Sequence, residues 1–214
     1  MSNPIRVIVA DGHPVCVRGV QVEVAEMSHA RVVASAQNST QLFSVLLSQP
    51  CDVLVSDYVM SGESFGDGLG MLTLIQQRHP ALKLIVLTSI DSPLVLQAVE
   101  RLGVQGIVSK SDMTEHLRHA IQATWRGDRY RSPRIRGALE AGTGGAGAER
   151  ASKLTPCEVE VVRLFLAGLT VGEIAEKFSR SKQTVSAQKR AAMRKLDVHS
   201  DSELVRYGVR NGMT

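Results

Sequence analysis

Four polar residues stand where separate short apolar runs of the sequence end. A single aspartate in such a place usually does no more than cap a turn. Four polar residues at the ends of four runs are harder to attribute to chance, so we interpret them as one site. They are Asp11, Asp57, Thr88 and Lys110.

The types of these residues suit phosphoryl chemistry. A carboxylate such as Asp57 beside the ammonium of Lys110 is held ionised and oriented, and it can act as a nucleophile toward a phosphoryl group. The Thr88 hydroxyl can donate to a phosphoryl oxygen. Asp11 beside Asp57 would help to bind Mg²⁺, a hard cation that prefers oxygen ligands, and the metal and the lysine would neutralise the charge of the transferred group. The sequence offers no second base or substrate pocket, so we predict no enzyme acting on an external substrate.

The runs before these residues alternate with helical patterns. The predicted strands are 5–10, 31–35, 53–57, 82–88 and 106–110, and the predicted helices are 15–27, 41–47, 69–78, 93–102 and 114–125. This alternation favours an α/β fold with a parallel sheet covered on both faces. Because the carboxyl ends of parallel strands meet in one crevice outside the sheet, the four polar residues are expected to converge there.

The composition describes a soluble chain of two parts. Its 214 residues are 43% hydrophobic, and the formal net charge is +4. The three cysteines are widely spaced, which suits reduced thiols in a cytosol. No apolar run approaches 18 residues, so we predict no signal peptide, no membrane span and a cytoplasmic location. A glycine- and alanine-rich segment marks a flexible linker. The predicted domains are 1–126, a linker at 127–152, and 153–214.

The C-terminal part contains the helix-start signals of a small all-α domain. Thr155 with Glu158, Thr170 with Glu173 and Ser200 with Glu203 have the spacing of capping boxes at helix starts. Ser181 can cap a further helix, whose apolar face carries Val185, Ala192, Met193 and Leu196. Four short helices in this span predict a helix-turn-helix.

The helix after Ser181 is strongly basic. Residues 177–195 include seven lysines and arginines and no acid. Such a stretch on an amphipathic helix after a tight turn is typical of a helix that reads the major groove, although a solvated basic face is the plainer alternative. We expect Ser186, Ala187, Lys189 and Arg190 to point outward, with Arg190 suited to guanine and Ala187 to a thymine methyl. Phosphate contacts suit Lys182, Thr184, Gln188 and Lys189. The predicted DNA-binding residues are Lys182, Thr184, Ser186, Ala187, Gln188, Lys189, Arg190 and Arg194.

The strand-end set, in this order, resembles the receiver domain of bacterial two-component response regulators over about residues 4–126. The resemblance implies a CheY-like (flavodoxin-like) five-stranded parallel (βα)5 fold. It implies that Asp57 is the phosphoacceptor, Thr88 the switch hydroxyl and Lys110 the phosphate-binding lysine. It also implies Mg²⁺ held by Asp11, Asp57 and the backbone of Val59.

The chain departs from the receiver pattern at a metal ligand. Two adjacent acids usually follow the first strand in this family, whereas Asp11 is followed by Gly12. We therefore predict weak Mg²⁺ binding and slow phosphorylation. Ser61 stands where proline is common, and Ile107 stands where many receivers carry a switch aromatic residue.

The C-terminal part is similar to the LuxR/NarL-type (FixJ) helix-turn-helix over about 152–212. The similarity is carried by Leu154-Thr-Pro, Ala167-Gly-Leu-Thr, Glu173-Ile-Ala, Thr184-Val and Arg194-Lys-Leu. Gln183 departs from it, since lysine is usual there. Both parts together resemble capsule-synthesis regulators of the RcsB type, through Gly66-Asp-Gly68 and the run 186–190.

The resemblance implies a DNA-binding transcriptional regulator in which phosphorylation of Asp57 controls dimerisation and promoter binding. The implied partners are promoter DNA, a sensor histidine kinase or phosphotransfer protein, and a second copy of the chain or an auxiliary regulator in a heterodimer. Gly12 motivates an alternative, an atypical regulator governed by a partner protein or by its expression level. An aspartyl-phosphate hydrolase on the same fold is a further alternative, because this fold does not fix function.

Overall fold

The computed structural model describes residues 3–60, 67–141 and 146–211. Contacts divide the chain into two compact units, residues 1–89 with 102–136 and residues 90–101 with 137–214. Within the described ranges, no helix is both long and apolar enough to cross a membrane.

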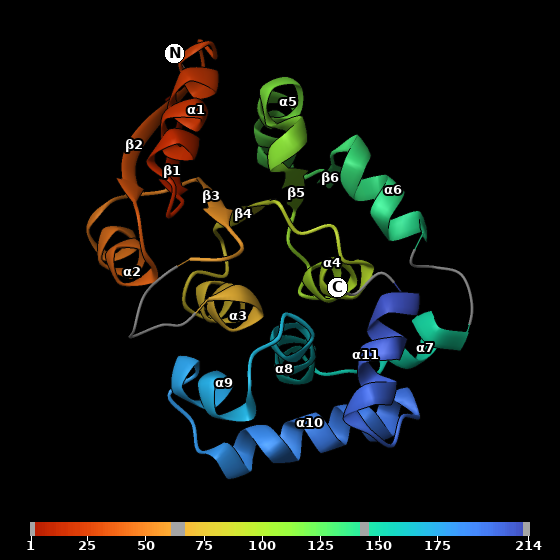
Figure 1. The fold of residues 1–214 in the computed structure, drawn as a ribbon. Helices are drawn as coiled ribbons and strands as arrows, with labels where there is room; N and C mark the ends of the chain where they lie inside the picture. Colours follow the sequence, from red (N-terminus) through yellow and green to blue (C-terminus); the bar gives the residue numbers. More distant parts are fainter. Residues whose placement is uncertain (1–2, 61–66, 142–145, 212–214) are drawn as a thin grey trace. The chain divides into compact units, whose positions relative to one another are not determined.

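The first unit is built on a parallel sheet (Figure 1). Its strands are β1 (Ile5–Ala10), β2 (Ala30–Ala36), β3 (Val53–Asp57), β4 (Lys83–Thr88), β5 (Gly106–Ser109) and β6 (Tyr130–Arg131). They lie in the order β2-β1-β3-β4-β5-β6, and all neighbouring pairs are parallel. The expected α/β receiver fold is confirmed, and its strand order reverses direction between β1 and β3. Open α/β sheets bind ligands at such a switch point.

Helices cover both faces of this sheet. They are α1 (Pro14–Ala25), α2 (Ser39–Ser48), α3 (Gly68–Arg78) and α5 (Met113–Arg126), with α1 and α5 on one face and α2 and α3 on the other (Figure 1). Val20 of α1 and Ile121 of α5 share a buried cluster with Val55 of β3. The next residues along the strands point to the opposite face, and Leu54 there is also fully buried. The strands β1, β3, β4 and β5 are largely apolar because both of their faces are covered, whereas the edge strand β2 is mostly half-buried or exposed.

The sheet has one more strand than the five predicted. β6 comprises only Tyr130 and Arg131, which is too short for a periodic pattern to reveal. Side-chain hydrogen bonds stabilise its pairing with β5, since the Ser132 hydroxyl accepts a hydrogen bond from the Ser109 backbone N–H at 3.0 Å. The Arg131 guanidinium also donates to the carbonyls of Val104 and Gln105.

Helices occupy much of the segment predicted as a flexible linker. α6 spans Pro133–Ala141 and α7 spans Ala146–Ser152, so the prediction of an unstructured tether is wrong for those residues. Alanine is the best helix former, and each glycine in a helix costs only about 1 kcal/mol relative to it. Residues 142–145 lie outside the described ranges, and the predicted boundaries at 126/127 and 152/153 stay a prediction.

The second unit contains the predicted small helical domain. Its helices are α4 (Pro93–Arg101), α7, α8 (Pro156–Leu166), α9 (Val171–Lys177), α10 (Lys182–Leu196) and α11 (Asp201–Arg210). The predicted capping boxes of α8 and α9 are confirmed, and Ser181 caps α10 as expected. At α11 the Ser200 hydroxyl caps Glu203 N–H, but the Glu203 carboxylate accepts from His199 N–H rather than from Ser200. The third predicted box is therefore only half formed.

Candidate functional site

The strand ends bring the predicted phosphoryl site together. Asp57 is the last residue of β3, and Thr88 is the last residue of β4. Asp11 directly follows β1, and Lys110 directly follows β5. The register places Asp57 opposite Leu87 and Thr88 opposite Ser109, so these ends lie at the same edge of the sheet.

Lys110 joins the two carboxylates. Its Nζ lies 2.8 Å from Oδ2 of Asp57 and 2.8 Å from Oδ2 of Asp11. Burial lowers the pKa of the ammonium, but the hydrogen bonds to Asp11 and Asp57 outweigh that effect and leave its pKa above the ordinary value. The lysine is therefore a fixed positive charge at the position where a phosphoryl group on Asp57 would add negative charge.

Asp57 is almost fully buried, with 4% of its surface exposed. Burial raises the pKa of its carboxyl above the ordinary value, although the hydrogen bond and the charge of Lys110 act in the opposite direction. Among the described residues, the Oδ1 atom accepts a single long bond, 3.4 Å, from the Val59 backbone N–H. One carboxylate oxygen is thus held by Lys110, and the other is weakly engaged.

His13 is a member of the site that the sequence did not reveal. Its backbone N–H donates to Asp11 Oδ1 at 2.8 Å, and its Nδ1 lies 3.1 Å from the same oxygen. Ligand atoms of Asp11, His13 and Asp57 all lie within 4.8 Å of one another. A histidine two residues after the first strand-end acid was the available signal, but only carboxylates were considered as ligands.

The donor set fits a divalent cation. Asp11 is 1% exposed, and it and Asp57 offer hard carboxylate oxygens to one point in space. Gly12 contributes no side chain, as the sequence indicated. The carbonyl of Val59 stays a predicted ligand. Ser61 and Gly66, which the sequence analysis named, lie outside the described residues.

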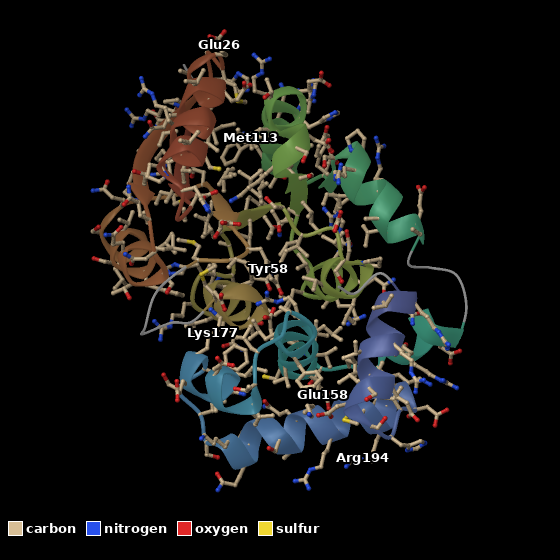
Figure 2. The ribbon with its side chains drawn as sticks, viewed as in Figure 1. Glu26, Tyr58, Met113, Glu158, Lys177 and Arg194 are labelled. Carbon is tan, nitrogen blue, oxygen red and sulfur yellow. The ribbon has the colours of Figure 1, made fainter. Side chains whose placement is uncertain are left out.

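The basic face of α10 contains most of the residues predicted to bind DNA. Lys182, Thr184, Ala187, Arg190 and Arg194 are exposed, whereas Ser186 and Gln188 are partly buried. The side chain of Gln188 is only partly open to solvent, with its Oε1 atom buried. Figure 2 shows Arg194 on this helix.

Lys189 does not point outward, so that expectation is wrong. Its side chain is 12% exposed, with Nζ 2.7 Å from Asp201 Oδ1 and 4.1 Å from the centre of the Phe165 ring. The cause is helical spacing, because a residue four positions after Val185 lies on the same buried stripe. The long apolar stem of a lysine can be buried in this way while its ammonium finds a partner.

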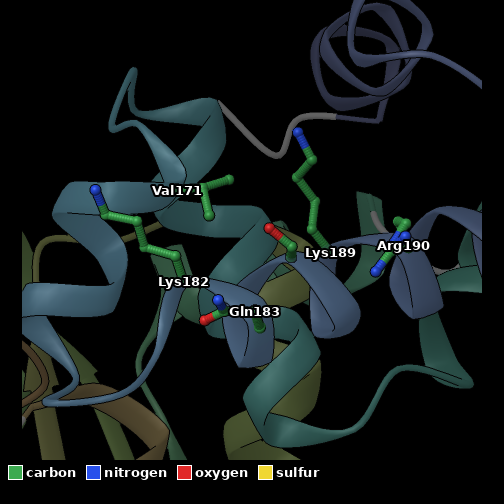
Figure 3. A pocket seen from close by; sticks show the side chains of 6 residues that line it. Val171, Lys182, Gln183, Lys189 and Arg190 are labelled. Atoms are coloured by element: carbon green, nitrogen blue, oxygen red, sulfur yellow. The ribbon is translucent and has the colours of Figure 1, made fainter.

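The N-terminal half of α10 borders a shallow basic hollow. Figure 3 shows the side chains of its lining. The lining residues are Val171 of α9 and Lys182, Gln183, Ser186, Lys189 and Arg190 of α10. A second ion pair fixes the other half of the helix, because Lys195 Nζ lies 2.6 Å from Glu158 Oε2 of α8.

Comparison with known families matches two parts of the chain, and the first match includes α4, which the contacts group with the second unit. Residues 7–122 match the response regulator receiver domain, and residues 152–208 match the bacterial regulatory proteins of the luxR family. The chain is 37% identical to the transcriptional regulatory protein RcsB of Escherichia coli K12, over 96% of this chain and 94% of the relative. It is 30% identical to the oxygen regulatory protein NreC of Staphylococcus carnosus, over 96% and 97% of the two chains.

Solved structures give the same result. An RcsB structure from Salmonella typhimurium matches with a TM-score of 0.79 and 34% identity, over 98% of this chain and 99% of that one. RcsB from Salmonella enterica serovar Typhimurium bound to the promoter P1flhDC with the phosphomimetic BeF3⁻ matches with a TM-score of 0.79 and 36% identity, over 96% and 98%. The chain belongs to the RcsB-like response regulators of the NarL/LuxR family, in which a receiver domain is joined to a luxR-type domain.

Proposed function

We propose that this regulator binds promoter DNA through α10 and that phosphorylation of Asp57 controls its dimerisation and DNA binding. The observation that carries the proposal is the bridge from Lys110 to Asp57 and Asp11, 2.8 Å on each side, in a chain that also carries an exposed basic recognition helix.

The strand-end geometry supports a defined phosphoryl-transfer step. A carboxylate oxygen of Asp57 attacks the phosphorus of a phosphohistidine or an acyl phosphate, and the bond from phosphorus to the donor breaks as the aspartyl phosphate forms. Lys110 pairs with the added negative charge, and Thr88 donates its hydroxyl to a phosphoryl oxygen. A divalent cation held by Asp11, Asp57 and the Val59 carbonyl would supply further charge neutralisation when bound.

The regulatory step follows from the same contacts. In the unmodified chain Lys110 is divided between two carboxylates, and a phosphoryl group on Asp57 would change that balance of charge. Moving Lys110 and Thr88 toward the phosphoryl oxygens would shift the outer strands and helices. The proposal assigns the response to dimerisation, which would place two helix-turn-helix units on paired half-sites.

The exposed face of α10 supports the DNA-binding role. Arg190 is the candidate for a base contact, and Lys182, Thr184 and Arg194 are candidates for phosphate contacts. Ser186 and Gln188 are weaker candidates for DNA contacts because they are partly buried. Lys189 stabilises the helix from its buried side, through Asp201 and Phe165. Solved relatives named as an RcsB–DNA complex and as two RcsB dimers on two DNAs are consistent with this role.

The proposed function requires two kinds of protein partner. A sensor histidine kinase or a phosphotransfer protein would supply the phosphoryl group, and a second copy or an auxiliary regulator would complete the dimer. Because a promoter-binding regulator must reach the chromosome, we propose a cytoplasmic location. Because Gly12 replaces an acidic metal ligand, one alternative is a regulator that acts with little or no phosphorylation under the control of a partner protein.

Acetyl phosphate tests the transfer step directly. Incubation of the full chain with acetyl phosphate and Mg²⁺ should add the mass of one phosphoryl group to the wild type and none to Asp57→Ala. A peptide map should then find the modification at Asp57. If wild type and Asp57→Ala stay equally unmodified, with Mg²⁺ or with Mn²⁺, the phosphorylation switch is wrong and the alternative regulator is favoured.

A further inference from the structure

Gly12 supplies no side-chain ligand, and the packing around it does not require a glycine. A Cβ atom built at this position would have its nearest neighbour, the Gln37 carbonyl oxygen, at 3.6 Å, which is an ordinary van der Waals contact. Its backbone conformation is also open to residues with a side chain. The backbone and its nearest neighbours therefore leave room for a side chain to begin here, so packing around Cβ does not explain the glycine.

His13 stands next to Gly12 with a nitrogen donor. Its Nδ1 lies 3.1 Å from Asp11 Oδ1, and its ligand atom lies within 4.8 Å of those of both aspartates. The imidazole is 74% exposed, so it can turn toward a bound ion without disturbing the core. It is also the N-cap residue of α1 without using its side chain as a cap, so turning the ring would break its Nδ1 contact with Asp11 Oδ1 but no capping hydrogen bond.

The two aspartates divide their oxygens between Lys110 and the His13 side. Lys110 contacts the Oδ2 atom of each carboxylate. The Oδ1 atom of Asp11 faces His13, and within the described part of the chain the Oδ1 atom of Asp57 meets the Val59 N–H at 3.4 Å. A cation held through the Oδ1 atoms therefore need not displace the lysine.

A nitrogen ligand changes which cation is preferred. Mg²⁺ is hard and binds oxygen, whereas imidazole favours first-row transition ions, whose affinities for such ligands rise from Mn²⁺ onward. We propose that His13 replaces the missing acid as the third side-chain ligand, beside Asp11 and Asp57, and that the site therefore selects a first-row transition ion, with Mn²⁺ as the test case, over Mg²⁺. This inference rests on the proposed function, since it takes the strand-end cluster to be a receiver's metal site.

Metal binding without a phosphodonor tests the inference. Free Mn²⁺ can be followed by its electron paramagnetic resonance signal during titration of the full chain, with Mg²⁺ added as a competitor. We expect wild type to bind Mn²⁺ at least about tenfold more tightly than Mg²⁺, and His13→Ala to lose about tenfold or more of its Mn²⁺ affinity with little change for Mg²⁺. Gly12→Asp should raise Mg²⁺ affinity and bring the Mn²⁺ and Mg²⁺ affinities closer together.

Two controls separate the possible failures. His29→Ala removes an exposed histidine outside the cluster and should leave both affinities unchanged, and thermal melting should show each variant folded. If His13→Ala binds Mn²⁺ as wild type does while Asp57→Ala loses it, the role of His13 is refuted and the receiver site stands. If neither wild type nor Gly12→Asp binds either ion, the inference falls together with metal-assisted phosphorylation.

Discussion

Lys189 donates to Asp201 across 2.7 Å, and this pair ties the recognition helix to the helix that follows it. The ammonium also lies over the Phe165 ring of α8, so one side chain connects three helices. A residue in the middle of the predicted DNA-reading surface thus supports that surface from the inside.

Lys189→Ala should therefore lower stability rather than remove a DNA contact. The lost ion pair and cation–π contact together amount to roughly 1–2 kcal/mol of the free energy of unfolding. Urea unfolding of the full chain, followed by circular dichroism, measures this loss. Lys182→Ala, which removes an exposed lysine from the same helix, is the matched control and should unfold like wild type. Equal stabilities of all three proteins would contradict the structural role.

The exposed cations of α10 should separate into two kinds of DNA contact. Arg190→Ala should cost about 1–3 kcal/mol on the duplex that wild type prefers and should relax its sequence preference. Lys182→Ala should weaken binding to every duplex alike and reduce the salt slope of the affinity by about 1. Fluorescence anisotropy across a salt series distinguishes them. Unchanged affinity in both variants would remove α10 from the interface.

Much of the fold was predictable, because four of the five predicted strands are almost entirely buried and end at a polar residue of distinct chemistry. Asp11, Asp57 and Lys110 meet as expected, since parallel strands bring their carboxyl ends together. β6 was not predictable, because two residues carry no period and its partners are backbone groups and the Ser132 hydroxyl. The orientation of Lys189 was missed because a charged residue on an apolar stripe was assigned to the surface.

Lys110 should be needed for phosphoryl transfer. Lys110→Ala removes the ammonium that lies 2.8 Å from each carboxylate and leaves two buried acids side by side. Removal of one such stabilising donor costs roughly 10²-fold in rate, and the initial rate of modification by acetyl phosphate measures it. Lys83→Ala, at the opposite end of β4, should react like wild type. A Lys110→Ala rate close to that of Lys83→Ala would exclude the proposed role.

Glu158 should make the helical domain sensitive to acid. Burial raises the pKa of its carboxyl, but the bonds from Lys195 and Thr155 outweigh that effect and leave the pKa below the ordinary value of 4.5. The stabilisation is therefore present above pH 4.5 and is lost as the pH falls through the lowered folded-state pKa. Glu158→Gln should be less stable than wild type at pH 7, and the difference should shrink toward pH 3.

Unfolding in urea at both pH values gives the two differences in free energy. Glu176→Gln, which changes an exposed carboxylate of α9, should show no comparable difference at either pH. A Glu158→Gln deficit that is equally large at pH 3 would show that the bonds to Lys195 and Thr155 do not depend on the carboxylate charge.

The central claim is that phosphorylation of Asp57 changes DNA binding. The direct measurement is a mobility shift with a duplex enriched by the wild-type protein from a random-sequence pool, using wild type and Asp57→Ala with and without acetyl phosphate. We predict that acetyl phosphate tightens binding by wild type, shifts it toward a two-copy complex, and leaves Asp57→Ala unchanged. Equal responses of the two proteins, or no response in a wild type shown to be phosphorylated, would contradict the claim.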